Sequence, residues 1–260
     1  MSLAWPAEER KLYYISGSPY ALRAQLALTE KGIPFTAVLL DATNGGLGGD
    51  LVRRVNPRGQ SPSFADGPDV RVHESLAILH YLEAVYTDAA PLMPPPSDPA
   101  ARARVLQRMH ESDALMVPVL ACLYSVFGNP PLYPKLDLDT DDGARRLRDL
   151  NRRVAAELLA WEGHLAAGAG TAAGGGFTAA DCALAPAYLH LWRLGGEALF
   201  ASLPQGKRYV EMLLERPSVR ANWPPHWQRG PARPPFSTVH DDLVDLTRNA
   251  EDRQRAPPPG

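Results

Sequence analysis

The sequence predicts a small α/β domain followed by an all-helical domain. Short apolar and aromatic runs alternate with helical patterns up to about residue 86. The stretch DAAPLMPPPSDP, at 88–99, then holds five prolines, each of which removes a backbone donor and clashes with the preceding turn of a helix. Beyond this linker the apolar periodicities are helical.

The first segment is expected to run strand, helix, strand, helix, hairpin and helix. The first helix follows the SGSP loop and ends at Lys31-Gly32, and a Gly67-Pro68 turn joins the two strands of the hairpin. The loop TNGGLGGD is expected to be flexible. The predicted strands are 11–15, 35–40, 62–66 and 69–73, and the other two helices are 50–55 and 75–86.

The second segment is expected to hold four longer helices, at 99–127, 140–166, 178–194 and 205–215. From Pro224 the chain is rich in proline and polar residues. Within this tail, Val239, Leu243 and Leu246 have the spacing of a short helix that docks on the core. The predicted organisation is a first domain at 9–88, a linker at 89–98, a helical domain at 99–227 and a tail at 228–260.

Composition excludes several classes of function. A net charge of −2 and a pI near 6.4 give no electrostatic reason for binding nucleic acid or an anionic membrane. Cys122 and Cys182 are not in a C-x-x-C pair, so neither a disulfide framework nor a redox motif is indicated. The scattered histidines indicate no metal site. With no signal-peptide pattern at the N-terminus, a cytoplasmic protein is expected.

Ser18 is the first candidate for chemistry. It precedes Pro19 at the predicted start of a helix, where a serine cap followed by proline is a common structural pattern. The same hydroxyl is a hydrogen-bond donor at the positive end of a helix dipole, which suits a thiolate.

Two further stretches predict a binding site for an extended peptide. In NPRGQSP, at 56–62, a cis Pro62 would expose the backbone of Ser61 to a ligand that pairs like a strand. In HES, Ser75 is a good helix cap beside an anion site, and Glu74 suits an ammonium group. Read alone, NPRGQSP is better explained by an ordinary loop proline, and HES by an ordinary helix cap.

FTAADCALAP, at 177–186, has Thr178 and Asp181 in the spacing of a capping box, so its role is expected to be in folding.

Together and in this order, these pieces resemble the cytosolic glutathione S-transferase family, over about residues 11–223. NPRGQSP is similar to the family's Asn-Pro-x-Gly-x-Val-Pro motif, and HES to its Glu/Gln-Ser pair. FTAADCALAP is similar to its Ser/Thr-x-x-Asp box. SPYALRAQLAL resembles the first helix of the serine-type classes, with Ser18 five positions before Arg23.

The resemblance implies a thioredoxin-like N-terminal domain, an all-α C-terminal domain and a homodimer. Ser18 would be catalytic and would donate a hydrogen bond to the sulfur of glutathione, the co-substrate. Gln60, Ser61 and Pro62 would hold its cysteinyl part, and Glu74 and Ser75 its γ-glutamyl end. The expected activity is the conjugation of glutathione to hydrophobic electrophiles, a detoxification reaction.

Several alternatives stay open. The same first site would serve a glutathione-dependent isomerase, peroxidase or dehalogenase, and the fold would serve a non-catalytic dimerisation or ligand-carrying module. The activating hydroxyl could also come from Tyr13, Tyr14, Ser16 or Tyr20. TNGGLGGD offers no basic residue for the glycyl carboxylate, for which Arg53 and Arg54 are the remaining candidates. A stripe on the long helix after the linker is either core or the electrophile pocket: Met109, Asp113, Met116, Leu120 and Tyr124.

Overall fold

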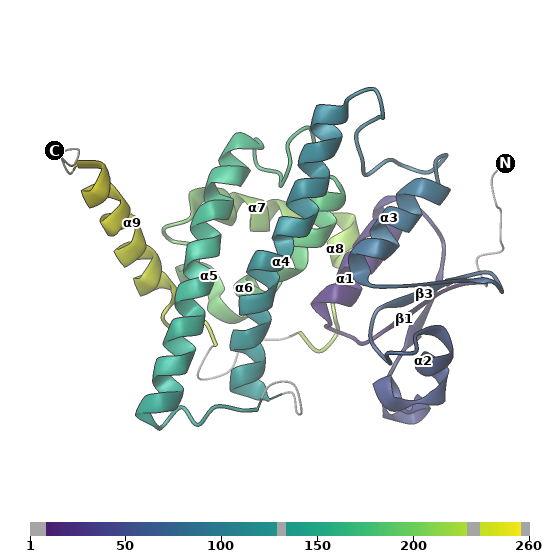
Figure 1. Ribbon diagram of the computed structural model, residues 1–260, viewed down its shortest axis with the longest axis horizontal. Coiled ribbons are helices and arrows are strands. Elements are labelled where there is room, and N and C mark those ends of the chain that lie inside the picture. Colours follow the sequence, from purple (N-terminus) through teal and green to yellow (C-terminus); the bar gives the residue numbers. More distant parts are fainter. Residues whose placement is uncertain (1–8, 129–133, 228–234, 256–260) are drawn as a thin grey trace.

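A computed structural model of the chain describes residues 9–128, 134–227 and 235–255. Its first part is a four-stranded sheet with three helices (Figure 1). The strands lie in the order β2-β1-β3-β4, with β1 parallel to β2 and antiparallel to β3. The elements are β1 (Arg10–Tyr14), α1 (Pro19–Glu30), β2 (Thr36–Leu39), α2 (Asp50–Val55), β3 (Ser63–Asp66), β4 (Val70–His73) and α3 (Ser75–Val85). This is the α/β, thioredoxin-like arrangement that the sequence predicts.

The two faces of the sheet are covered by different helices, because neighbouring residues of a strand point to opposite faces. Leu12 and Phe64 face the large core, which also contains side chains of α1, α3 and the helical domain. Tyr13 and Ala65 face a small second core with Val52 and other side chains around α2. One face of the sheet therefore meets α1, α3 and the helical domain, and the other meets α2.

The second part is helical and confirms the predicted all-α domain. Compared with the prediction, the third of its long helices extends five residues further, to Leu199, and contains a non-helical Gly196 with φ 66°. A short helix, α8, was not predicted. The helices are α4 (Pro99–Phe127), α5 (Asp141–Ala167), α6 (Ala179–Leu199), α7 (Pro204–Glu215), α8 (Pro217–Ala221) and α9 (Val239–Arg255). No helix in the described ranges is long and apolar enough to cross a membrane.

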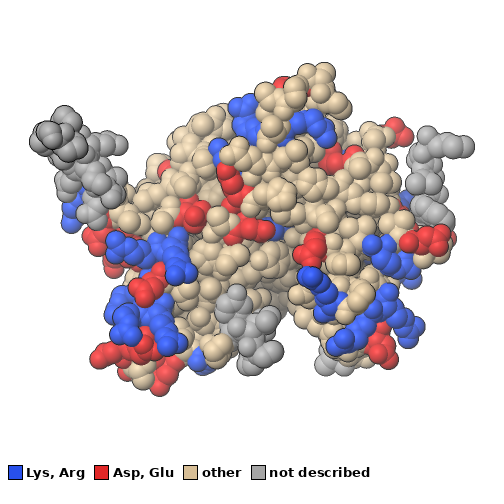
Figure 2. Space-filling view, in the orientation of Figure 1, with Lys and Arg blue, Asp and Glu red and all other residues tan. Residues whose placement is uncertain are grey.

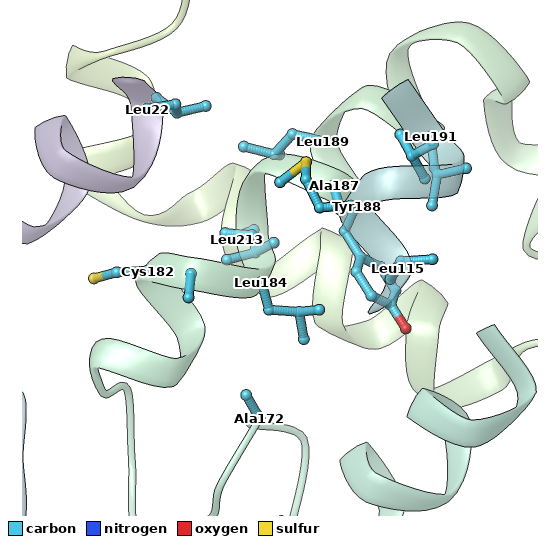
Figure 3. Packing of buried hydrophobic residues seen from close by; sticks show 14 of the residues in the cluster. Leu22, Leu115, Ala172, Cys182, Leu184, Ala187, Tyr188, Leu189, Leu191 and Leu213 are labelled. Carbon is cyan, nitrogen blue, oxygen red and sulfur yellow. The ribbon is translucent and has the colours of Figure 1, made fainter. Parts of the chain in front are cut away.

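The main core is built around α6, whose residues from Ala179 to Leu191 are all buried. Side chains from α1, α4 and α7 pack around this helix, and Figure 3 labels Leu22, Leu115 and Leu213 among them, together with Tyr188 of α6. Burial of apolar surface on this scale is the main stabilising term of such a domain.

α6 begins at the predicted capping box. The Thr178 backbone N–H donates to the Asp181 carboxylate at 2.9 Å, and the Thr178 hydroxyl donates to it at 3.0 Å. Asp181 also accepts the backbone N–H of Ala172, which ties the α5–α6 connection to the helix. The prediction of a structural role for this motif is confirmed.

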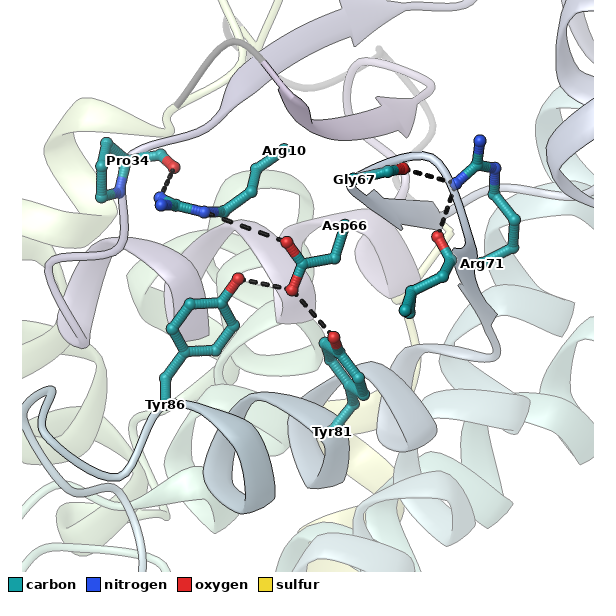
Figure 4. Close-up of polar contacts among 8 residues, drawn as sticks. Arg10, Pro34, Asp66, Gly67, Arg71, Tyr81 and Tyr86 are labelled. Atoms are coloured by element: carbon teal, nitrogen blue, oxygen red, sulfur yellow. Dashed lines mark hydrogen bonds and ion pairs between the residues drawn. The ribbon is translucent and has the colours of Figure 1, made fainter. Parts of the chain in front are cut away.

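Asp66, at the end of β3, fastens α3 to the sheet (Figure 4). Its carboxylate accepts hydrogen bonds from the hydroxyls of Tyr81 at 2.8 Å and Tyr86 at 2.5 Å, and Arg10 lies 4.0 Å away. Burial raises the pKa of both tyrosines, and the bonds to Asp66 add to the effect. Both hydroxyls therefore stay protonated as donors, and the C-terminal half of α3 is held against the sheet.

The tail contributes a longer helix than the sequence suggests. α9 lies along the outer side of α5 (Figure 1), with Val239 and Leu243 fully buried and Leu246 packed against the core. The three residues that predicted a docked helix are thus the ones that make the contact.

Candidate functional site

The loop between β1 and α1 is a tight turn. The Ser18 backbone N–H donates to the Ile15 carbonyl at 3.1 Å, and Gly17, the third residue of the turn, has φ 80°. A type II turn needs a positive φ at this position, which glycine adopts without strain. The side chain of Ser18 then caps α1 by accepting the Ala21 N–H at 3.4 Å. Because this bond uses a lone pair, the hydroxyl proton remains available to donate.

The predicted NPRGQSP motif forms a second turn beside the first. The Asn56 side chain donates to the Gln60 carbonyl at 3.2 Å, and the buried Ser63 hydroxyl donates to the same carbonyl at 3.0 Å. The Ser61–Pro62 peptide bond is cis, whereas the stretch read alone favoured an ordinary loop proline. The Ser61 hydroxyl accepts the backbone N–H of Ile15 at 3.0 Å. The two turns are therefore joined directly.

The Glu74–Ser75 pair departs from the prediction in one respect. Ser75 is not the cap of α3: the capping position is Glu74, whose φ is 70° and whose side chain makes no capping bond. The Ser75 hydroxyl is instead buried and accepts from Arg23 at 3.5 Å. The Glu74 side chain is exposed and pairs with Arg58 at 3.7 Å. An exposed carboxylate thus stands beside the first N–H groups of a helix.

Arg23 connects the predicted site to the helical domain. Its guanidinium is completely buried, donates to the Ala183 carbonyl at 2.8 Å and to the Ser112 hydroxyl at 3.0 Å, and pairs with Asp113 at 2.8 Å. Arg23 lies near the same end of α1 as Ser18. Its guanidinium contacts Ser75 of α3, Ser112 and Asp113 of α4 and Ala183 of α6, so it helps to set the spacing of these four helices. The sequence-based analysis noted Arg23 only for its spacing from Ser18 and did not predict this role.

Residues near the C-terminal end of the helical domain also reach the first turn. His226 Nδ1 lies 3.4 Å from the Ser16 hydroxyl oxygen, and the ring of Trp227 lies next to Gly17. Behind them, His190 of α6 is buried. Burial lowers the pKa of His190 to about 3, with the nearby cation Arg193 adding to the effect, so its imidazole is neutral. The sequence-based analysis named Ser16 as an alternative activating hydroxyl but missed the roles of His226, Trp227, His190 and Arg193.

The stripe on α4 is mostly core. Met109, Met116 and Leu120 are buried in the main cluster, so an electrophile pocket built from this stripe is wrong for these three residues. Asp113 pairs with Arg23, and its side chain is 44% exposed. Tyr124 is half-buried. A surface hollow of about 550 Å³ lies further along, where the end of α4 meets residues 135–139, and the half-exposed Phe127 lines it.

The remaining candidates lie at the surface. The Gln60 and Arg54 side chains are exposed, and Arg53 donates to the Gly48 carbonyl at 3.2 Å. Positive and negative side chains are interspersed on the face in Figure 2, which fits a small ligand better than a polyanion. Within the described ranges there is no group of three or more residues that could hold a metal ion.

Two family models match the chain. The model for the N-terminal domain of glutathione S-transferases matches residues 17–85, and that for their C-terminal domain matches residues 139–217. Glutathione S-transferase A of Pleuronectes platessa is 32% identical over 227 residues, which cover 86% of this chain and 96% of that protein.

Two solved structures are similar over nearly their whole length. A glutathione S-transferase from the Antarctic clam Laternula elliptica has a TM-score of 0.74 and 31% identity, and the match covers 89% of this chain and 99% of that one. A maleylacetoacetate isomerase from Methylobacterium extorquens AM1, with bound malonate and GSH, has a TM-score of 0.64 and 27% identity, with 85% and 100% covered.

Proposed function

Because the chain belongs to the glutathione S-transferase family, we propose that it conjugates glutathione to hydrophobic electrophiles, with Ser18 stabilising the thiolate. The observation that carries this proposal is the state of the Ser18 hydroxyl. It accepts the Ala21 N–H at the start of α1, so its own proton is directed elsewhere, and the turn that holds it is tied to Ser61. A sulfur placed between these two turns would receive that proton as a hydrogen bond.

The energy required is modest. A cysteine thiol has a pKa of about 8.5 and is only a few per cent ionised at pH 7. Half ionisation at neutral pH requires a shift of about 1.5 pKa units, or roughly 2 kcal/mol. A charge-assisted hydrogen bond at the positive end of a helix is of this size. The thiolate then attacks the electrophile, and the sulfur–carbon bond forms as the leaving group departs.

The rest of glutathione would lie across the two neighbouring turns. The backbone of Gln60 and Ser61 would pair with the cysteinyl residue beside Pro62, as an added strand does. The exposed Glu74 carboxylate would bind the γ-glutamyl ammonium group, and Ser75 with the first N–H groups of α3 would bind the adjacent carboxylate.

Substitution of Ser18 by alanine tests the proposal. We expect kcat/KM for a generic aryl halide at pH 7 to fall about 10–30-fold, which corresponds to the roughly 2 kcal/mol above. The Kd of glutathione should change less than about threefold, because the other contacts remain. Ser97→Ala, at an exposed serine of the linker, is the matched control. Full activity in Ser18→Ala would show that another hydroxyl activates the thiol.

A glutathione-dependent isomerase is the second candidate, favoured by the likeness to the maleylacetoacetate isomerase of known structure. In an isomerisation the glutathione adduct forms and breaks again, so glutathione is not consumed. Incubation with a cis-configured unsaturated diketo acid separates the two activities: conversion to the trans isomer at constant glutathione concentration would identify the isomerase.

A cytoplasmic homodimer is the assembly usual in this family and forms part of the proposal. Sedimentation equilibrium at micromolar concentration tests it, and a particle of one chain mass, 28.3 kDa, would contradict it.

A further inference from the structure

His226 and Trp227, in the segment that follows α8, contact the turn that holds Ser16, Gly17 and Ser18. His226 Nδ1 lies 3.4 Å from the hydroxyl oxygen of Ser16. A Cβ atom on Gly17 would come within 2.8 Å of ring nitrogens of both His226 and Trp227. The two rings can therefore approach the backbone of Gly17 only because this residue has no side chain. Their approach places the imidazole of His226 beside the turn that carries Ser18.

The position of His226 is fixed by its neighbour Trp227. The Trp227 ring is 6% exposed and meets the His190 ring edge-on, with 4.6 Å between centroids. The guanidinium of Arg193 lies 4.9 Å from the centre of the Trp227 ring, and the Trp223 ring packs against it at 5.2 Å. Trp227 is thus anchored on α6 and on Trp223, and it holds the exposed His226 beside the turn.

Two ionisable groups of α6 lie close to this cluster. His190 is neutral, because burial lowers its pKa to about 3. Arg193 is positive and lies over the Trp227 ring that adjoins His226. A thiolate beside Ser18 would add a negative charge to these neutral and positive surroundings.

We propose that His226, acting through the Ser16 hydroxyl, takes up the proton that the glutathione thiol loses on binding. The sulfur–hydrogen bond breaks and its electron pair stays on sulfur. The Ser16 oxygen receives that proton while its own proton passes to Nδ1 of His226, so that a thiolate and an imidazolium replace a thiol and an imidazole. Ser18 donates its hydrogen bond to the resulting thiolate. This inference rests on the proposed function.

The geometry suits this transfer. Ser16 and Ser18 flank Gly17 in one turn, so a sulfur that accepts from Ser18 lies beside Ser16 as well. The 3.4 Å contact between Ser16 and His226 is long, as hydrogen bonds of this kind often are before the substrate binds. Because the thiol proton stays on His226, the transfer releases no proton into solvent. Proton release on glutathione binding can be measured.

The test compares His226→Asn with the wild-type protein. The asparagine amide keeps a polar atom near the position of Nδ1, so it can bond to Ser16 but cannot take up a proton. At about pH 7.5, a pH indicator dye in weak buffer measures proton release on glutathione binding, and ultraviolet difference absorbance measures the thiolate formed. His110→Asn, at an exposed histidine of α4, is the control.

We expect the wild-type protein and the control to release markedly fewer protons than the thiolates they form. His226→Asn should release about one proton per thiolate and lose about tenfold in kcat/KM at neutral pH. Equal proton release per thiolate in the wild type and His226→Asn would overturn this inference and leave the role of Ser18 standing. Absence of any thiolate in the wild-type protein with bound glutathione would overturn both.

Discussion

Replacement of Asp113 by asparagine is expected to destabilise the protein more than replacement of its buried partner, Arg23, by methionine. The two residues form a 2.8 Å ion pair in which the Arg23 side chain is 0% exposed and the Asp113 side chain 44% exposed. Removing the carboxylate leaves a guanidinium that cannot lose its proton and cannot reach water. Removing the guanidinium leaves a carboxylate that water can solvate.

The magnitude follows from the distance and the exposure. Two unit charges 2.8 Å apart interact by about 6 kcal/mol at a dielectric constant of 20 and by about 1.5 kcal/mol in water. Since Asp113 is partly hydrated, and an asparagine oxygen would keep a partial negative charge beside the guanidinium, we expect Asp113→Asn to lose about 2 kcal/mol. Arg23→Met fills a similar volume and removes bonds together with the charge, so its expected cost is about 1 kcal/mol.

Urea unfolding followed by tryptophan fluorescence measures both changes, and the double variant completes the cycle. We expect the double variant to be as stable as Arg23→Met, because asparagine has no charge to compensate once the guanidinium is gone. The coupling free energy is then about 2 kcal/mol. Two results would refute this reasoning. One is a double variant whose loss of unfolding free energy equals the sum of the two single losses. The other is a larger loss in Arg23→Met than in Asp113→Asn.

Three further outcomes are expected. Gly17→Ala should cost about 2 kcal/mol in urea unfolding and weaken glutathione binding, since φ is 80° there and two rings occupy the space of a Cβ; a stability equal to wild type would contradict the packing. Burial alone would raise the pKa of Glu30, but hydrogen bonds from Arg216 and a neighbouring serine lower it below the usual 4.5. Its stabilising effect is therefore complete above pH 4.5 and lost as the pH falls through the folded pKa. Glu30→Gln should be about 2 kcal/mol less stable than wild type at pH 7, and the difference should shrink as the pH is lowered below 4.5. Leu243→Ala should weaken α9 docking by about 2–3 kcal/mol and speed protease cleavage of the tail, whereas Val244→Ala, at a 37% exposed position, should not.

Features that depend on a few neighbouring residues could be predicted from the sequence. The cap at Ser18 and the capping box at Thr178 are satisfied within one turn of helix, so the residue types alone indicate the contacts. The docked helix around Leu243 was likewise indicated by apolar spacing. The strands and long helices followed for the same reason, with ends displaced by a few residues.

Features that depend on distant contacts were misread or missed. Ser75 was predicted as a cap because it precedes an apolar helix, but its hydroxyl is engaged by Arg23, from another helix, and Glu74 takes the capping position with a positive φ. The methionines of α4 have the spacing of either a pocket or a core, and their burial depends on α6, which the local pattern does not contain.

Gly17 shows how a distant contact changes the meaning of a local signal. In the sequence, a glycine between Ser16 and Ser18 indicates a turn with a positive φ, and the φ of 80° agrees with this. The same position also receives the rings of His226 and Trp227, from more than two hundred residues further along the chain, and each would lie 2.8 Å from a Cβ. A residue that tolerates a positive φ, such as asparagine, would satisfy the turn but not the approach of these rings. The absence of a side chain is therefore required twice here, and the second requirement connects the C-terminal end of the helical domain to the turn that carries Ser18.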